Sequence, residues 1–172
     1  MEINYKLTEE DYLKFNLFHI KNSKTAIKAL NIQRFLPPIF FIIAAYISTT
    51  VMNASLPVML IIFLTISILW IIFYPKYFYN YIIRNTKKLL REGTSDGLLG
   101  EHHLIMTEEG IEDSTSNSDS KVRWSGFVNL EEDSYNFYLY NSSVSAYIIP
   151  KREISDVERM KDYLNSHIVS QK

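Results

Sequence analysis

The uncharged segment "FLPPIFFIIAAYISTTVMNASLPVMLIIFLTISILWIIFYP" (35–75) decides the fold, because it contains no Asp, Glu, Lys or Arg along its whole length. A helix needs about 20 apolar residues to cross the hydrocarbon core of a bilayer. One helix over the whole segment would be far too long, whereas two spans at about 35–53 and 56–75 fit. The segment therefore predicts a transmembrane hairpin, since helices pair every backbone amide internally in lipid.

Turn residues and prolines mark the ends of the two spans. The tripeptide "NAS" (53–55) favours a turn. Pro57 suits the first turn of a new helix, because its missing N–H would be unpaired there anyway. Pro37 and Pro38 are expected to mark the start of the first span for the same reason.

Basic residues flank the hairpin on both sides and are absent from its turn. They are Lys14, Lys21, Lys24, Lys28 and Arg34 before the first span, and Lys76, Arg84, Lys87, Lys88 and Arg91 after the second. Because the turn is short, both flanks lie on one side, and the positive-inside rule makes that side the cytoplasm. Trp70, Tyr74 and Tyr77 resemble an interfacial aromatic belt. We expect a multi-pass protein of the inner (plasma) membrane with both termini cytoplasmic.

An anchoring hairpin has two alternatives, a buried hairpin of a soluble protein and a channel or transporter. A buried helical hairpin of a soluble protein would show a polar stripe on its solvent side. The only candidates for such a stripe are Ser48, Thr49, Thr50, Thr65 and Ser67. A channel or transporter would carry ionisable residues inside its spans, and the segment 35–75 has no Asp, Glu, Lys or Arg.

The charge is distributed unevenly along the chain. Residues 1–91 hold 11 Lys+Arg and 4 Asp+Glu, a balance of +7, and residues 92–172 hold 7 and 15, a balance of −8. The acidic second half disfavours nucleic acid as a partner. The chain has no cysteine, which excludes disulfides and cysteine-based zinc sites. The polar, acidic N-terminus does not resemble a signal peptide.

The N-terminal arm (1–34) is expected to hold a strand and helices. Ile3, Tyr5 and Leu7 alternate with polar residues, which predicts a strand at 2–8. "TEED" (8–11) resembles a capping box with Thr8 as N-cap, followed by a helix towards residue 22. A further helix at 23–35 leads into the membrane. After the hairpin, 76–93 is expected to form a basic juxtamembrane helix that ends at Gly93.

The remainder of the chain (94–172) changes to a period of two, which is typical of strands. Strands are predicted at 100–107, 110–114, 120–125, 127–132, 135–140 and 144–150. Their short connections favour one antiparallel meander. A closing helix begins with the capping box "SDVE" (155–158), led by Ser155. Its apolar stripe is Val157, Met160, Leu164 and Ile168.

The predicted fold class is an α+β membrane protein. It combines the transmembrane hairpin with a small antiparallel barrel or sheet capped by the C-terminal helix. This order of elements is found in pleckstrin-homology-like (PH-like) barrels. If the strand at 2–8 joins the sheet, the hairpin is an insertion into that domain; the alternative is a separate N-terminal arm.

The segments "INYKLTEEDYLKF" (3–15) and "VRWSGFVNLEEDSYNFYLYNSSVSAYIIPKR" (122–152), with the paired spans between them, resemble the YcxB-like membrane protein family. Trp124 and the stretch 136–152 carry the most specific part of the resemblance. Glu153 and Ile154 depart from it, because an aromatic residue often follows the Lys-Arg pair. The resemblance implies a two-span bacterial membrane protein with a cytoplasmic PH-like domain and no known enzyme activity.

No catalytic, cofactor-binding or metal-binding residues are expected. His102 and His103 are neighbours on a strand and point to opposite faces, so they do not chelate one metal. The acidic run 131–133 fits a solvated turn better than a calcium site, which needs further oxygen ligands at fixed spacing. The sequence lacks nucleophile and phosphate-loop motifs, and its aromatic strand residues are expected to pack the core.

Basic residues are the remaining candidates for contact with a membrane surface or a partner. Lys121, Arg123, Lys151 and Arg152 lie near strand ends, and Lys87, Lys88 and Arg91 lie on the juxtamembrane helix. Each basic residue near an anionic leaflet contributes about 1 kcal/mol. The alternative is that these charges only keep the sheet ends soluble.

The sequence thus predicts a non-enzymatic bacterial inner-membrane protein whose PH-like domain mediates contact with a protein or with the membrane surface. The expected partners are the lipid bilayer, a membrane protein or peptide, and a second copy of the chain. The alternative is immunity to a bacteriocin or antimicrobial peptide, or protection against envelope stress.

Overall fold

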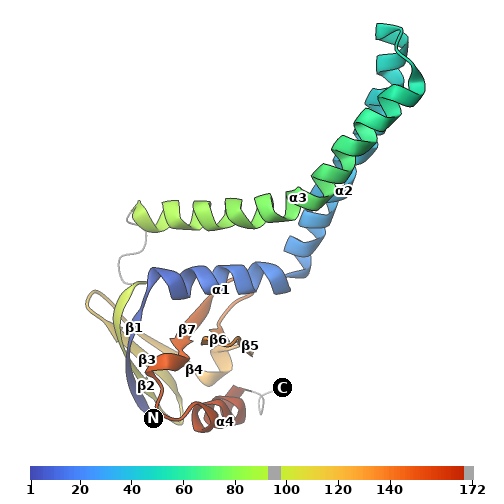
Figure 1. The fold of residues 1–172 in the computed structure, drawn as a ribbon. Coiled ribbons are helices and arrows are strands. Elements are labelled where there is room, and N and C mark those ends of the chain that lie inside the picture. The colour runs from blue at the N-terminus through green and yellow to red at the C-terminus, as the bar shows by residue number, and fades with distance from the viewer. Residues whose placement is uncertain (93–97, 169–172) are drawn as a thin grey trace. The chain divides into compact units, whose positions relative to one another are not determined.

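The computed structural model describes residues 1–92 and 98–168, which form an α+β fold with four helices and two antiparallel sheets (Figure 1). In chain order the elements are β1 (Glu2–Leu7), α1 (Glu9–Asn22), α2 (Lys24–Met52), α3 (Leu56–Arg91), β2 (Gly100–Met106), β3 (Gly110–Thr115), β4 (Asp119–Arg123), β5 (Asn129–Glu132), β6 (Asn136–Tyr140), β7 (Ala146–Pro150) and α4 (Val157–Ile168). Short 3₁₀ turns follow β4 at Trp124–Gly126 and β7 at Lys151–Glu153.

The chain divides into two units, which are described separately below. The sheet unit comprises residues 1–19 and the described part of 85–172, and the hairpin unit comprises residues 20–84. The sheet unit is therefore built from both ends of the chain, with the hairpin unit inserted between them.

The strand predicted at 2–8 is confirmed and joins the sheet. β1 pairs antiparallel with β2, with Tyr5 opposite His102 and Leu7 opposite Gly100. The four-stranded sheet has the order β1-β2-β3-β4, and a three-stranded sheet has the order β5-β6-β7. Of the two arrangements left open by the sequence, the structure has the insertion.

The prediction of one antiparallel meander, closed as a barrel or open as a sheet, is wrong in one respect. The described strands form two sheets, and these do not close into a barrel. The strand predicted at 120–125 ends at Arg123. Trp124 turns into the core, where only 3% of its surface is exposed and its Nε1 donates to the carbonyl of Thr107 at 2.9 Å. The resulting 3₁₀ turn separates β4 from β5.

The core of the sheet unit lies between the two sheets and is closed by α4. Phe137, Tyr138 and Leu139 are fully buried on β6. The apolar stripe predicted for the last helix is confirmed, since Met160 and Leu164 are buried with Ile168 and Val157 packs against the cluster. The N-cap of α4 lies one residue later than predicted, because Asp156, and not Ser155, accepts the N–H of Arg159 at 3.0 Å.

In the hairpin unit each predicted span is continuous with its flanking helix. α2 includes both the predicted helix at 23–35 and the first span, so Pro37 and Pro38 lie inside a helix instead of starting one. α3 likewise includes the juxtamembrane helix, and Gly93 lies outside the described residues. The turn is as predicted, with Asn53 in the left-handed conformation (φ 49°).

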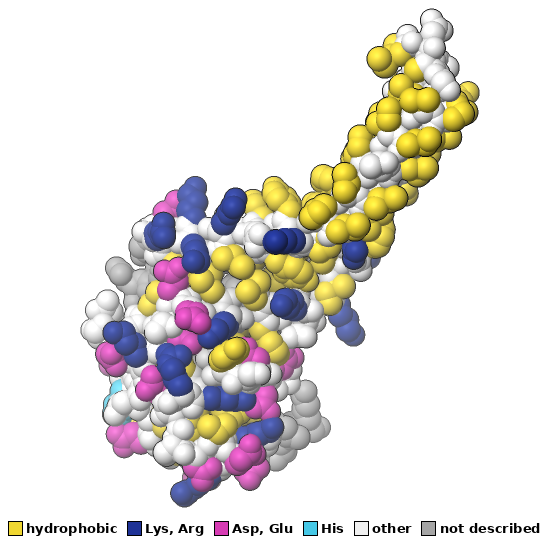
Figure 2. Space-filling view, viewed as in Figure 1, with side chains coloured by type: hydrophobic (Ala, Val, Ile, Leu, Met, Phe, Trp, Pro, Cys, Tyr) yellow, Lys and Arg dark blue, Asp and Glu magenta, His cyan; other side chains and the backbone are white. Residues whose placement is uncertain are grey.

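Both long helices expose apolar side chains along their length (Figure 2). The most apolar stretch of α2 has a mean hydropathy of 1.8 and is 11% buried. That of α3 has a mean hydropathy of 2.8 and is 6% buried. Both are long and apolar enough to cross a membrane. The hydroxyls that could have formed a polar stripe each donate to a carbonyl of their own helix, as seen for Ser48, Thr49, Thr50, Thr65 and Ser67. These five hydroxyls are therefore satisfied without water.

The helices are joined by a reciprocal pair of hydrogen bonds at their prolines. A proline lacks the N–H that would bond the carbonyl four residues earlier, so Pro37 leaves the carbonyl of Gln33 unpaired and Pro75 leaves that of Ile71 unpaired. Trp70 Nε1 donates to Gln33 O at 3.2 Å, and Arg34 Nε donates to Ile71 O at 2.9 Å. Each helix thus supplies the donor that the other lacks.

We predict that replacing Trp70 by Phe costs about 1 kcal/mol of unfolding free energy, because the Gln33 carbonyl loses its donor. In a Pro37→Ala background the residue 37 amide is restored, so the same replacement should cost less than half as much. Unfolding of the full-length protein in detergent micelles measures both values. An equal cost in the two backgrounds would show that the tryptophan does not compensate the proline.

Candidate functional site

Two of the predicted basic residues are paired with acidic groups of the sheet unit. Lys121 forms an ion pair with Glu112, which lies opposite it on β3. Lys151 Nζ donates to Glu132 Oε2 at 2.6 Å and to the carbonyl of Asp133 at 2.6 Å. Their charges are therefore largely neutralised by these neighbours.

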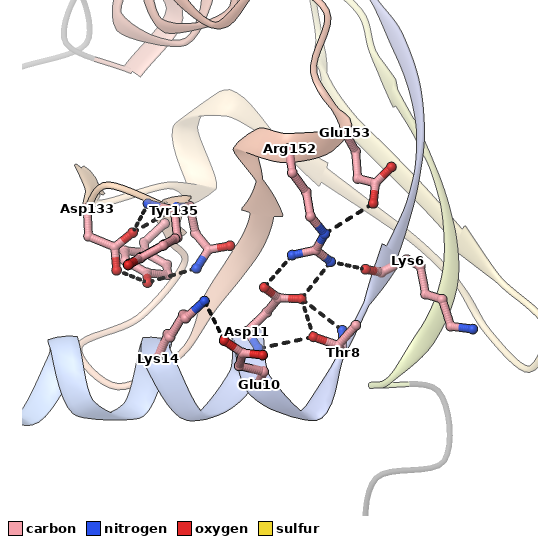
Figure 3. A network of polar contacts seen from close by, with 11 residues as sticks. Lys6, Thr8, Glu10, Asp11, Lys14, Asp133, Tyr135, Arg152 and Glu153 are labelled. Atoms are coloured by element: carbon pink, nitrogen blue, oxygen red, sulfur yellow. Dashed lines mark hydrogen bonds and ion pairs between the residues drawn. The ribbon is translucent and has the colours of Figure 1, made fainter.

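Arg152 is the most extensively bonded of the predicted residues (Figure 3). Its Nη1 and Nη2 donate to the two carboxylate oxygens of Asp11 at 2.6 and 2.8 Å, and Nη2 also donates to the carbonyl of Lys6 at 2.8 Å. Asp11 accepts from the N–H and the hydroxyl of Thr8, which confirms the predicted capping box. Burial opposes ionisation of Asp11, but the hydrogen bonds from Arg152 and Thr8 lower its pKa below the usual value. This network ties the N-terminal arm to the end of β7.

The remaining predicted residues lie apart from this network. Arg123 ends β4. Lys87 is 3.8 Å from Glu9, and Lys88 is 3.6 Å from Glu92. Arg91 is the last residue of α3. The seven residues thus lie at separate places on the sheet unit, and five of them, Lys87, Lys88, Lys121, Lys151 and Arg152, have acidic partners.

The sheet unit also contains a polar cleft of about 240 Å³ at one end of its two sheets. The lining residues come from all four strands of the first sheet, from β7, and from the residues beside them: Tyr5, Leu7, Leu98, His102, Asp113, Thr115, Ser118, Ser120, Asn141, Ser145, Ala146, Tyr147 and Ile148. A concave site with convergent polar groups is the usual location for a ligand, so this cleft is the candidate functional site.

A buried ion pair lies in the cleft. His102 Nδ1 is 3.0 and 3.1 Å from the two oxygens of Asp113, and Nε2 is 3.2 Å from the carbonyl of Leu98. The ring of Tyr5 stacks on the imidazole at 5.0 Å. Burial alone would lower the pKa of His102, but the hydrogen bonds to Asp113 and Leu98 raise it above the usual value. An imidazolium satisfies both acceptors, because it donates from both nitrogens.

This geometry determines what His102 can do chemically. General-base catalysis and metal binding each need a free ring nitrogen, and both nitrogens of His102 face protein acceptors. His103 points outwards and its Nε2 is 2.7 Å from Glu2, so the predicted opposite orientation of the two rings is confirmed. Within residues 1–92 and 98–168 no group of three His, Asp or Glu side chains could hold a metal ion.

The acidic run at 131–133 was expected in a turn, but only Asp133 lies in the β5–β6 turn, because Glu131 and Glu132 are the last residues of β5 and pair with β6. Asp133 Oδ1 accepts the backbone N–H groups of Tyr135 and Asn136 at 2.7 and 2.8 Å, and Oδ2 accepts the hydroxyl of Tyr138 at 2.7 Å. Glu132 pairs with Lys151 and Lys161. These carboxylates therefore stabilise the β5–β6 hairpin and its contact with α4.

Sequence reasoning missed Asp113 and Tyr5 as members of a site. Asp113 lies opposite Leu104, one diagonal position from His102 on the same face of the sheet. The signal was an acidic residue at an inward position of the strand predicted at 110–114, where the alternating pattern requires an apolar residue.

For the Arg152 network we predict that Arg152→Lys costs about 1–2 kcal/mol of stability, because lysine cannot bond both oxygens of Asp11 in parallel. Asp11→Asn should cost about 1–3 kcal/mol, since it removes the carboxylate that accepts from both Nη1 and Nη2 and leaves Arg152 with Glu153 alone as a charge partner. Arg159→Lys, on the exposed side of α4, is the matched control and should be neutral. Thermal or chemical unfolding in micelles measures all three. Equal effects at positions 152 and 159 would contradict the network's role.

For the cleft we predict a stability that falls as the pH rises. A raised folded-state pKa of His102 stabilises the protein fully below the ordinary histidine pKa of about 6.5, and this stabilisation is lost as the pH rises through the folded-state value. The unfolding free energy should therefore decrease as the pH rises above about 6.5. His102→Gln should flatten this dependence and His103→Gln should retain it. A slope unchanged by His102→Gln would contradict the assignment.

Comparison with protein-family models identifies residues 107–164 as similar to the family described as YcxB-like protein. The match begins directly after β2 and ends within α4, so it covers β3 to β7 and most of the last helix. Searches of curated proteins and of solved structures each found no match. The family match confirms the resemblance predicted from the sequence over residues 107–164, which are similar to the YcxB-like family.

Proposed function

We propose that this protein is a non-enzymatic interaction module anchored in the inner membrane of a bacterium. In this proposal α2 and α3 cross the bilayer as a hairpin, and the sheet unit lies in the cytoplasm and binds a partner protein. The observation that carries the proposal is the pairing of β1 with β2. Because these strands lie on opposite sides of the hairpin in the sequence, both flanks must be on the same side of the membrane.

The distribution of charge supports the cytoplasmic orientation. Basic residues of the hairpin unit lie beside the spans and not in the turn between them: Lys21, Lys24, Lys28, Arg34, Lys76 and Arg84. Such a bias places the flanks in the cytoplasm. Trp70 and Tyr74 lie next to Gln33 and Arg34, where the uncharged segments meet the basic ones, as expected for an interfacial belt.

The element order of the sheet unit supports a PH-like domain. Four strands in one sheet, three in a second sheet and one closing helix follow each other along the chain. The engaged nitrogens of His102 support a binding role over catalysis. The order of elements supports the fold, and the His102 side chain supports the role, because the function of a fold is determined by its sites.

A protein partner fits the sheet unit better than an anionic membrane surface. Lys121, Lys151 and Arg152 are each paired with carboxylates, which weakens their attraction to lipid head groups. Beside the spans, three basic residues form no ion pair within the described part of the chain: Lys24, Lys28 and Arg84. In the proposal these helix flanks contact anionic lipid, each contributing about 1 kcal/mol.

Single cysteines test the orientation directly, because the natural chain has none. We predict that Ser55→Cys, in the exposed hairpin turn, reacts with a membrane-impermeant maleimide on cells whose outer envelope has been permeabilised. Ser143→Cys, in the exposed β6–β7 turn, should react only after the inner membrane is disrupted.

The two variants are matched, since each replaces an exposed serine in a turn by cysteine. Labelling of Ser143→Cys while the inner membrane is intact would overturn the cytoplasmic placement. Recovery of the full-length protein from the aqueous fraction without detergent would overturn the membrane anchor.

A further inference from the structure

We propose that the cleft beside His102 binds a small uncharged molecule that presents a hydroxyl or carbonyl oxygen to the hydroxyl of Tyr5. This inference goes beyond the proposed function, because it assigns a ligand site inside the sheet unit and does not depend on the orientation in the membrane. It rests on a buried donor, on the charge balance of the cleft and on the size and polarity of its lining.

The first observation is the hydroxyl of Tyr5. Only 3% of Tyr5 is exposed, its side chain lines the cleft, and its hydroxyl has no hydrogen-bond partner among the described residues. Burial raises the pKa of Tyr5 far above the usual value, with the charge of Asp113 adding to the effect. The hydroxyl therefore stays protonated and is available as a donor to an acceptor in the cleft.

The second observation is the charge balance. His102 and Asp113 are 7% exposed and lie 3.0 Å apart, so while His102 is protonated the pair contributes no net charge. A charged ligand would enter without a free counter-ion, and burying an unpaired charge is strongly unfavourable. The cleft therefore selects an uncharged molecule.

The third observation is the lining. Ser120 and Tyr147 share a hydrogen bond of 2.9 Å across the cleft, and hydroxyl groups can donate as well as accept. Ser118, Ser145 and Asn141 add further polar groups. A volume of about 240 Å³ is below the range for drug-sized ligands. The ligand is accordingly a small polar molecule with several oxygen or amide groups.

The experiment titrates the full-length protein in detergent micelles with four probes, observed by NMR of labelled tyrosine and histidine side chains. Glycerol and N-methylacetamide are the uncharged probes, and acetate and inorganic phosphate are the charged ones. We expect a saturable change at Tyr5 and His102 with at least one uncharged probe and none with the charged probes. Tyr5→Phe keeps the ring stacked on His102 but removes the donor, and should weaken binding about five- to tenfold.

Two further variants make the outcome decisive. Tyr135→Phe removes the hydroxyl of an exposed tyrosine outside the cleft and should leave binding unchanged. Ser145→Leu, at the exposed rim of the cleft, should weaken binding even if Tyr5→Phe fails to fold. Absence of saturation with both uncharged probes, equal binding in the Tyr5→Phe protein, or equally tight binding of acetate would overturn the proposal.

Discussion

The antiparallel pairing of β1 with β2 is the interaction on which the rest of the structure depends. It brings together strands separated in the chain by residues 8–99, and Met1 extends it through mutual backbone bonds with Met106 at 2.7 Å. Closing so long a connection costs conformational entropy. The buried side chains of Tyr5 and Leu7 and the Asp11–Arg152 pair offset this cost at the same end of the chain. Through this pairing, the helical hairpin is an insertion into the sheet unit, and the two chain segments that flank the hairpin meet in one sheet.

Much of this architecture follows from periodicity, and its exceptions have local physical causes. The uncharged segment predicts two helices because lipid requires internal backbone pairing. The alternation at Ile3, Tyr5 and Leu7 predicts a strand. Pro37 is expected to mark the start of a span, since a proline removes a hydrogen bond, and Pro75 is the last residue of the second predicted span. They lie inside helices because Trp70 and Arg34 supply the missing donors from the other helix, and no sequence rule for one helix contains that information.

The candidate site was less predictable than the fold. A period of two places His102 and His103 on opposite faces, but it does not reveal which residue of β3 meets His102. That contact depends on the register between strands, which is set by tertiary packing. The same limit applies to Arg152: its position after a strand suggested an outward charge, whereas Asp11, expected only to cap a helix, lies within reach because β1 joins the sheet. Both sites arise from contacts between distant parts of the chain.

The most direct test of the central pairing is a disulfide between β1 and β2. Asn4 lies opposite His103 in the register, and both side chains are on the outer face. The pair Asn4→Cys with His103→Cys should form a disulfide in the full-length protein under mild oxidation, detected as a loss of two free thiols and a shift in gel mobility. Asn4→Cys with Ser118→Cys is the control pair and should stay reduced. Failure of the first pair to form, or equal formation of both, would contradict a sheet built from the two ends of the chain.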